Sequence, residues 1–149
     1  MGLDSISLLD FENGWEITNS PMSFMPLGKL RMPETSAAGD VSHGGKKHLI
    51  SFKHDGPGSR VLEAHMDNFG PGGAITAHIE LFDEPDESMV ICTPFDKPGH
   101  FYYNQKINCM RAKGEVSYNG VKYVFDPSES FAVLDWGRGV WTYHNTWYW

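Results

Sequence analysis

The closing stretch DWGRGVWTYHNTWYW contains one carboxylic acid side chain and one guanidinium side chain among its tryptophans. Asp135 and Arg138 lie on either side of Trp136 and Gly137. An Asp in an apolar pocket has a raised pKa and can act as a general acid, for example by protonating an alkene. The same residues also have a structural interpretation. Asp135 would accept hydrogen bonds from turn amides, and Arg138 would stack on an indole or pair with a carboxylate at a glycine-containing corner. Asp135 is therefore a candidate catalytic residue, with the structural alternative open.

A second polar group lies in FYYNQKINCM, residues 101–110. Strand-like alternation puts polar residues on both faces of this stretch, and buried polar groups must find hydrogen-bond partners. Cross-strand hydrogen bonds and a solvated Lys106 would satisfy them, but so would a ligand cavity, which is apolar with a few convergent polar groups. On the cavity interpretation, the candidate ligand-binding residues here and in the closing stretch are Tyr103, Gln105, Asn108, Arg138, Trp141, Asn145 and Trp147.

The sequence shows no recognisable motif for metal binding, for a nucleophilic serine or for phosphate binding. The seven histidines show neither His-x-His nor a helical i,i+4 pair, so no metal site and no cofactor are expected. There is no Gly-x-Ser-x-Gly motif, and FGPGG at 69–73 is a turn that lacks the Lys of a phosphate loop. Cys92 and Cys109 are interpreted as reduced, buried, small apolar residues.

Composition narrows the class of protein. A length of 149 residues predicts a single domain, and 40% hydrophobic with 21% charged residues is close to globular averages. The net charge of −7 disfavours nucleic acids and anionic membrane surfaces as partners. Neither a secretory leader nor a membrane-spanning apolar run is recognised, so a cytoplasmic location is expected.

The elements that must position these residues are predicted to be strands. Period-2 alternation recurs from residue 48 to the end, separated by Gly, Pro and Asp turns, and no helix of three turns is recognised. Asn119-Gly120, between two alternating runs, predicts a two-residue hairpin turn. The prediction is an all-β antiparallel meander over residues 46–149, with an irregular N-terminal segment, residues 1–45, packed on the sheet.

The run VWTYHNTWYW, residues 140–149, is expected to be an interior strand. Alternation gives it one aromatic face with Trp141, Tyr143, Asn145, Trp147 and Trp149. Trp141 and Trp147 are therefore expected to be more buried than Trp15. Such an apolar edge needs cover, so a homodimer or larger oligomer is expected at this strand, with residues 1–45 folding back as the alternative.

Several long motifs resemble one known family. FYYNQKINCM, SFAVLDWGRGVW, NTWYW and GWE followed by MPLGKL resemble domain of unknown function 2804, from about Leu8 to Trp149. That family is broadly similar to lipocalin-like proteins, including carotenoid hydratase and tocopherol cyclase relatives, which are barrels around lipophilic ligands. The resemblance implies a lipocalin-like barrel or partial barrel. It also implies that this chain is a central portion, because members usually extend further at both ends.

Three hypotheses of function follow. The first is a lipocalin-like β domain that binds an apolar small molecule. The second is a hydratase, cyclase or isomerase that acts on a lipophilic substrate with Asp135 as general acid. The third is a structural β module that assembles with copies of itself.

Overall fold

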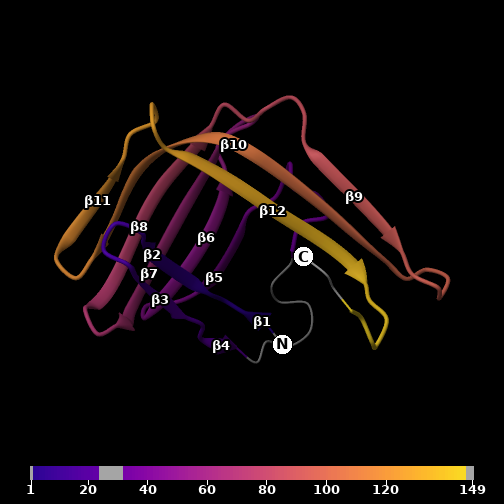
Figure 1. Ribbon diagram of the computed structural model, residues 1–149, viewed down its shortest axis with the longest axis horizontal. Coiled ribbons are helices and arrows are strands. Elements are labelled where there is room, and N and C mark those ends of the chain that lie inside the picture. Colours follow the sequence, from indigo (N-terminus) through magenta and orange to yellow (C-terminus); the bar gives the residue numbers. More distant parts are fainter. Residues whose placement is uncertain (1, 24–31, 147–149) are drawn as a thin grey trace.

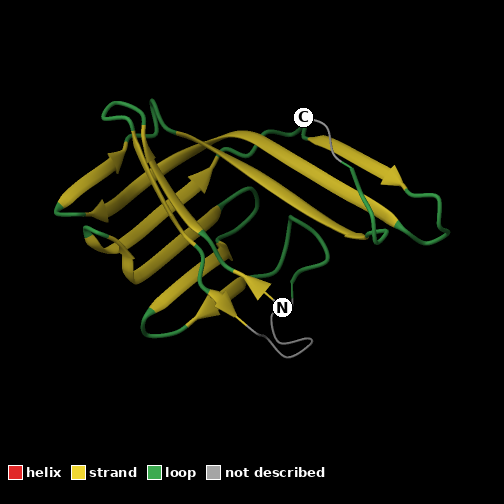
Figure 2. Cartoon of the chain, turned by 60° about the horizontal axis from the view of Figure 1, so that its bottom comes forward, coloured by secondary structure: helices red, strands yellow, loops and turns green. Residues whose placement is uncertain are grey.

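The computed structural model describes residues 2–23 and 32–146, and within them the chain forms only strands, turns and loops (Figures 1 and 2). The prediction of an all-β fold is confirmed. A search of the described residues for a helix that could cross a membrane finds none. The strands are β1 (Gly2–Leu3), β2 (Ile6–Asp10), β3 (Trp15–Asn19), β4 (Met22–Ser23), β5 (Val41–Gly44), β6 (His48–His54), β7 (Arg60–Gly70), β8 (Gly73–Phe82), β9 (Met89–Pro94), β10 (Phe101–Tyr118), β11 (Val121–Phe125) and β12 (Phe131–Val140).

One antiparallel sheet of eight strands dominates the molecule, in the order β11-β10-β8-β7-β6-β5. Its longest strand, β10, also pairs through its first half with β9 on one side and β12 on the other. Figure 1 shows this half as a wing that extends away from β5–β8. The antiparallel meander is as predicted, while the described strands leave the sheet open between β5 and β11, so they form no closed barrel.

Two local features in β10 and its turn shape the sheet. The hairpin at Asn119-Gly120 is confirmed: these residues have φ angles of 51° and 74°, and Tyr118 pairs with Val121 across the turn. The second feature is a β-bulge, where the pairing with β12 shifts register between Ile107 and Met110. Three residues apart, these two side chains would point to opposite faces of a regular strand, yet they are 1% and 0% exposed in one apolar cluster.

The described part of the N-terminal segment, which we expect from the sequence to be irregular, contains the short strands β1 to β5. β2 and β3 form a hairpin that crosses one face of the sheet (Figures 1 and 2). Its alternate residues pack against the buried cluster of Met66, Phe69, Ile75, Val116 and Tyr118. These packing residues are Ile6, Leu8, Trp15 and Ile17. The period-2 pattern of each of these strands is short and is surrounded by prolines and glycines, so the sequence does not predict the strands.

The prediction of an aromatic closing strand is wrong for residues 141–146. β12 ends at Val140, and the chain then bends, with the Asn145 amide donating to the Thr142 carbonyl oxygen at 2.7 Å. This local hydrogen bonding competes with strand pairing. Trp141 is 44% and Tyr143 96% exposed, whereas Trp15 is half-buried against the core, so the expected order of burial is reversed for Trp141. Trp147 and Trp149 lie outside the described residues.

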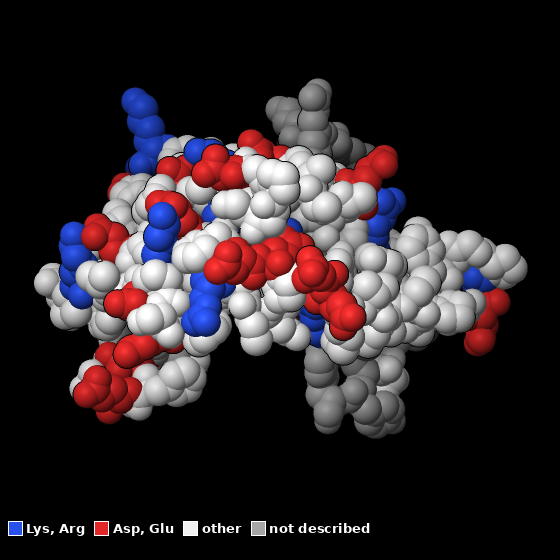
Figure 3. Space-filling model, turned by 90° about the horizontal axis from the view of Figure 1, so that it is seen from above, with Lys and Arg blue, Asp and Glu red and all other residues white. Residues whose placement is uncertain are grey.

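Charge is dispersed on the face seen in Figure 3. Lys and Arg side chains are scattered there among Asp and Glu, so the residues drawn in colour present no continuous basic surface. A nucleic acid backbone binds to clustered positive charge, and this face does not supply it.

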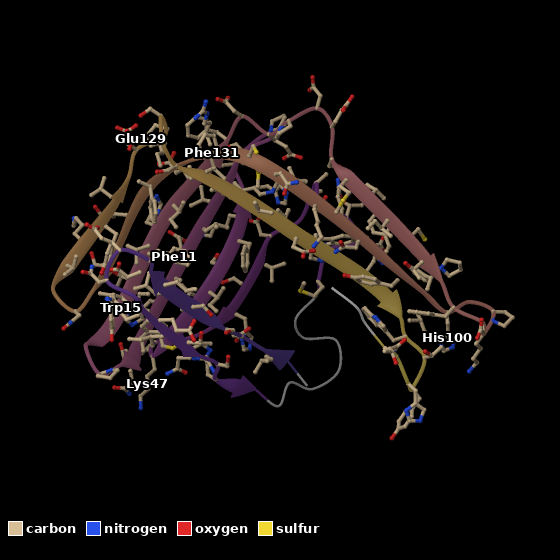
Figure 4. All side chains as sticks on the ribbon, in the orientation of Figure 1. Phe11, Trp15, Lys47, His100, Glu129 and Phe131 are labelled. Carbon is tan, nitrogen blue, oxygen red and sulfur yellow. The ribbon has the colours of Figure 1, made fainter. Side chains whose placement is uncertain are left out.

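Two phenylalanines provide a matched test of where the core lies. Phe69 is 2% exposed, against 91% for Phe11, which lies with Trp15 at the β2–β3 hairpin (Figure 4). We expect Phe69→Ala to lower the free energy of unfolding by about 3–5 kcal/mol because it empties a core position. Phe11→Ala should change it by less than about 0.5 kcal/mol. Urea unfolding followed by fluorescence measures both, and equal losses would contradict this assignment of the core.

Candidate functional site

An open groove of about 320 Å³ lies on the wing formed by β9, β10 and β12. Three of the residues predicted to bind a ligand, Tyr103, Gln105 and Arg138, line it. The sequence did not single out the other lining residues, which are Glu34, Thr35, Ser36, Cys92, Phe101 and Trp136.

Strand register explains why these side chains meet. Tyr103 pairs with Cys92 on β9 and Arg138 on β12, and Gln105 pairs with Trp136. Residues that are directly opposite in neighbouring strands project from the same face of a sheet. The rings of Tyr103 and Trp136 meet edge to face, with centroids 5.9 Å apart and an interplanar angle of 73°. The groove therefore has an aromatic wall set by the pairing of three strands.

A segment outside the wing, residues 34–36, closes one side of the groove, and we call it the strap. Ser36 is buried, and its hydroxyl donates to Gln105 Oε1 at 2.6 Å. Its carbonyl oxygen accepts from His54 Nε2 at 3.1 Å and from Arg60 at 3.2 Å. Strands β6, β7 and β10 thus hold one residue of the strap in place.

Arg138 also holds the strap, since its guanidinium donates to the Glu34 carbonyl oxygen at 2.9 Å. The expected glycine corner around it is absent, because β12 is a paired strand through Val140. The glycines instead leave room for β10. A Cβ at Gly137 would lie 2.9 Å from the Tyr102 ring, and one at Gly139 would lie 2.3 Å from the Phe101 carbonyl oxygen.

Asp135 lies opposite Lys106 in the pairing of β12 with β10 and does not line the groove. Lys106 forms an ion pair with its carboxylate, and the amide of the buried Asn104 donates to it at 2.6 Å. The hydrogen bonds from Lys106 and then Asn104 hold the pKa of Asp135 below its usual value. A general acid near neutral pH needs a raised pKa, so this environment favours the structural interpretation of Asp135.

Among the remaining candidates, Asn108, Trp141 and Asn145 do not line the groove. Asn108 is exposed at the β10 bulge, where it lines a second depression beside Lys106. Trp141 packs on Tyr102, with ring centroids 5.4 Å apart, and Asn145 bonds back to residue 142. Trp147 lies outside the described residues.

Metal-ligand side chains come together elsewhere. The donor atoms of Asp4, His43 and His48 all lie within 4.8 Å of one another, although the sequence showed no metal-ligand spacing. The β5–β6 hairpin brings the two histidines to the same face, with His43 opposite Ile50, and this placement depends on turn length and has no fixed sequence signature. Both thiols are exposed, so the expectation of buried cysteines is wrong.

The pKa of Asp135 gives a test by titration. A carboxyl group with a lowered folded pKa stabilises the protein above its unfolded pKa of about 3.9, and this contribution disappears as pH falls through the folded value. We expect the Asp135 carboxyl resonance in NMR to titrate below pH 3.8 and to move upward in Lys106→Met. Lys122→Met is a matched control, because Lys122 pairs with Glu115 on the other half of the sheet. An unmoved midpoint in Lys106→Met would show that the ion pair does not set this pKa.

Comparisons with known proteins give one result. No curated protein matches the chain, and no solved structure does. The model of the family described as domain of unknown function (DUF2804) matches residues 1–149. The likeness to lipocalins and the placement of the chain as a central portion remain predictions. The chain belongs to the DUF2804 family.

Proposed function

We propose that the groove on β9, β10 and β12 binds an apolar small molecule that carries one polar end. The observation behind this proposal is the edge-to-face pair of Tyr103 and Trp136 beside Arg138 in an open groove. Ligand sites combine aromatic surface with a few placed polar groups, and about 320 Å³ is at the small end of their range. The ligand class is therefore compact, with an apolar body that rests on the two rings.

Arg138 suggests the chemistry of the polar end. A guanidinium has five N–H donors in a rigid fork. The hydrogen bond to the Glu34 carbonyl oxygen uses NH1 and ties the side chain to another groove-lining residue. A carboxylate or another oxygen acceptor on the ligand would complement this cation.

Binding is favoured over catalysis in this proposal. The hydratase, cyclase or isomerase alternative relied on Asp135 as a general acid, but hydrogen bonds lower the pKa of this residue, and it does not line the groove. The groove-lining Gln105 has both ends of its amide engaged, by Ser36 and by Ser88 at 2.8 Å. These contacts support a preformed binding surface.

A cytoplasmic location remains part of the proposal. Cys92 and Cys109 are free and exposed, and exposed thiols persist in reducing compartments. Mass spectrometry of the protein isolated from its native cells would show whether the thiols are unmodified.

Substitution of two tryptophans distinguishes specific binding in the groove from non-specific binding to the protein surface. We expect Trp136→Ala to weaken binding of a dansyl-labelled fatty acid by about tenfold or more, because it removes half of the aromatic wall. Trp141→Ala should leave binding unchanged, since Trp141 contacts Tyr102 and does not line the groove. Probe fluorescence measures both affinities. Equal losses, or no saturable binding by the unsubstituted protein, would reject the groove as the site.

A second candidate function, self-association, is favoured by the edge strand β9. Met89, Val90 and Ile91 are 45%, 50% and 47% exposed, and among the described strands β9 pairs only with β10. The strand MVICTP contains no charged residue, whereas the other long edges carry Lys122 on β11 and Asp135 with Arg138 on β12. An uncharged apolar edge invites strand addition by another molecule. We place the contact there, because residues 141–146 do not form the expected C-terminal strand.

Two lysine substitutions, one on the edge strand β9 and one on the edge strand β11, test self-association. We expect light scattering at micromolar concentration to report at least twice the monomer mass, and Ile91→Lys to give a monomer. Val124→Lys is the control, since Val124 is 71% exposed on the β11 edge and should leave the dimer intact. A monomer at every concentration would reject self-association, and dissociation by the control alone would move the contact to β11.

A further inference from the structure

A group of three side chains, far in sequence from the groove-forming strands, has the composition of a metal site. We propose that Asp4, His43 and His48 bind one divalent transition-metal ion, with Zn²⁺ the ion that suits the donor set best. Two imidazole nitrogens and one carboxylate oxygen are common zinc donors, and three protein ligands leave a fourth position for water.

Strand pairing brings the two histidines together. His43 lies on β5 and His48 on β6, and the pairing places His43 opposite Ile50. Ile50 and His48 are two residues apart on β6, so both histidines project from the same face of the sheet. Lys47 lies in the turn that connects the two strands (Figure 4). The hairpin therefore presents an imidazole pair, with ring centroids 5.9 Å apart.

The third donor comes from a different part of the chain. Asp4 lies between β1 and β2, and its Oδ2 contacts His43 Nδ1 and lies 3.5 Å from His48 Nε2. With metal–nitrogen and metal–oxygen bonds of about 2.0–2.2 Å, donors at the corners of a tetrahedron lie roughly 3.4 Å apart. The separation of the carboxylate from His48 already matches that spacing. All the donor atoms lie within 4.8 Å, so small side-chain rotations would converge them on one centre.

His48 supplies the observation that favours a metal over a simple ion pair. Its Nε2 atom is buried and has no hydrogen-bond partner among the residues that the structure describes, although it lies 3.5 Å from Asp4 Oδ2. Buried ring nitrogens are normally satisfied, because an unmet polar atom costs free energy. A hydrogen bond between His43 and Asp4 alone leaves this nitrogen unmet, whereas a metal ion would accept its lone pair.

Burial of the group fits a site with one open position. The side chains of His43, His48 and Asp4 are 21%, 24% and 13% exposed. They are sufficiently shielded for stable coordination but still accessible to an ion and a water ligand. Bound metal would join the connection between β1 and β2 to the β5–β6 hairpin, since the ligands come from both.

The test uses the full chain without an affinity tag, freed of metal with a chelator. We expect calorimetric titration with ZnCl₂ to show one ion bound per chain, and the thermal midpoint to rise with Zn²⁺ because the ion binds the folded state. Loss of a group that merely supports a metal ligand weakens binding by about 10–100-fold. His48→Gln and Asp4→Asn, which remove ligands, should therefore weaken binding by at least about tenfold.

His65→Gln is the matched control. His65 is also a sheet histidine beside a carboxylate, with Nε2 2.7 Å from Asp67 Oδ1, but it does not belong to the proposed site. We expect this variant to bind Zn²⁺ like the unsubstituted chain. Cobalt(II) provides a second measurement on the unsubstituted protein, since tetrahedral coordination by nitrogen and oxygen gives visible absorption that Zn²⁺ should displace.

The outcomes are distinct. Absence of stoichiometric Zn²⁺ binding to the unsubstituted chain overturns the proposal, as does equal binding by His48→Gln and His65→Gln. If a ligand variant fails to fold, the cobalt spectrum of the unsubstituted protein decides: tetrahedral absorption displaced by one equivalent of Zn²⁺ supports the site, and its absence rejects it. Fatty acid binding by the groove is measured separately, so either proposal can fail without the other.

Discussion

The β-bulge at residues 108–109 of β10 is the constraint on which the arrangement of the molecule depends. Before it, the odd-numbered residues Tyr103 and Gln105 line the groove and Ile107 enters the core. After it, the even-numbered Met110 and Ala112 belong to that same cluster. A strand with strict alternation would turn one of these sets to the opposite face. By inserting an extra residue, the bulge lets one long strand build both the groove and the core on one continuous face.

The strap gives the groove its second wall, and most of the polar contacts that secure it are made by the buried Ser36. Ser36 receives hydrogen bonds from His54 and Arg60 and donates one to Gln105. Arg60 is 5% exposed and also forms an ion pair with Glu84, which compensates the cost of burying a guanidinium. Because these hydrogen-bond partners lie on β6, β7 and β10, the groove wall is tied to the main sheet as well as to the wing. A surface held in this way is preformed, which reduces the entropy lost when a ligand binds.

The sequence predicted the features that depend on local periodicity, and it failed where tertiary geometry decides. Alternation predicted the strands, and Asn119-Gly120 predicted its turn, because both follow from backbone preferences within a few residues. Tyr103, Gln105 and Arg138 lie together as expected, since no bulge separates them from the paired strands. Asn108 does not, because alternation along β10 turns it to the face opposite to Tyr103 and Gln105, and it is exposed beside the bulge. Trp141 was misplaced because alternation continued in the sequence while local hydrogen bonds ended the strand. The sequence does not indicate that Ser36 lines the groove, because this position results from the packing of the strap against strands that are distant in sequence.

The groove and the proposed metal site are joined by a short stretch of chain, and this raises the question of whether they influence each other. Ser36 of the strap and the ligand His43 are seven residues apart, and between them Asp40 accepts a hydrogen bond from the His54 backbone at 2.9 Å. Coupling between two sites requires an element with two arrangements that each ligand stabilises differently. The strap has its own hydrogen bonds to His54, Arg60, Gln105 and Arg138, none of which involves a proposed metal ligand. A metal ion would therefore stabilise the packing of the β1–β2 connection against the β5–β6 hairpin, while the groove keeps the shape that these hydrogen bonds already impose. The two sites are therefore close along the chain, but the free energy of metal binding at one does not depend on ligand binding at the other.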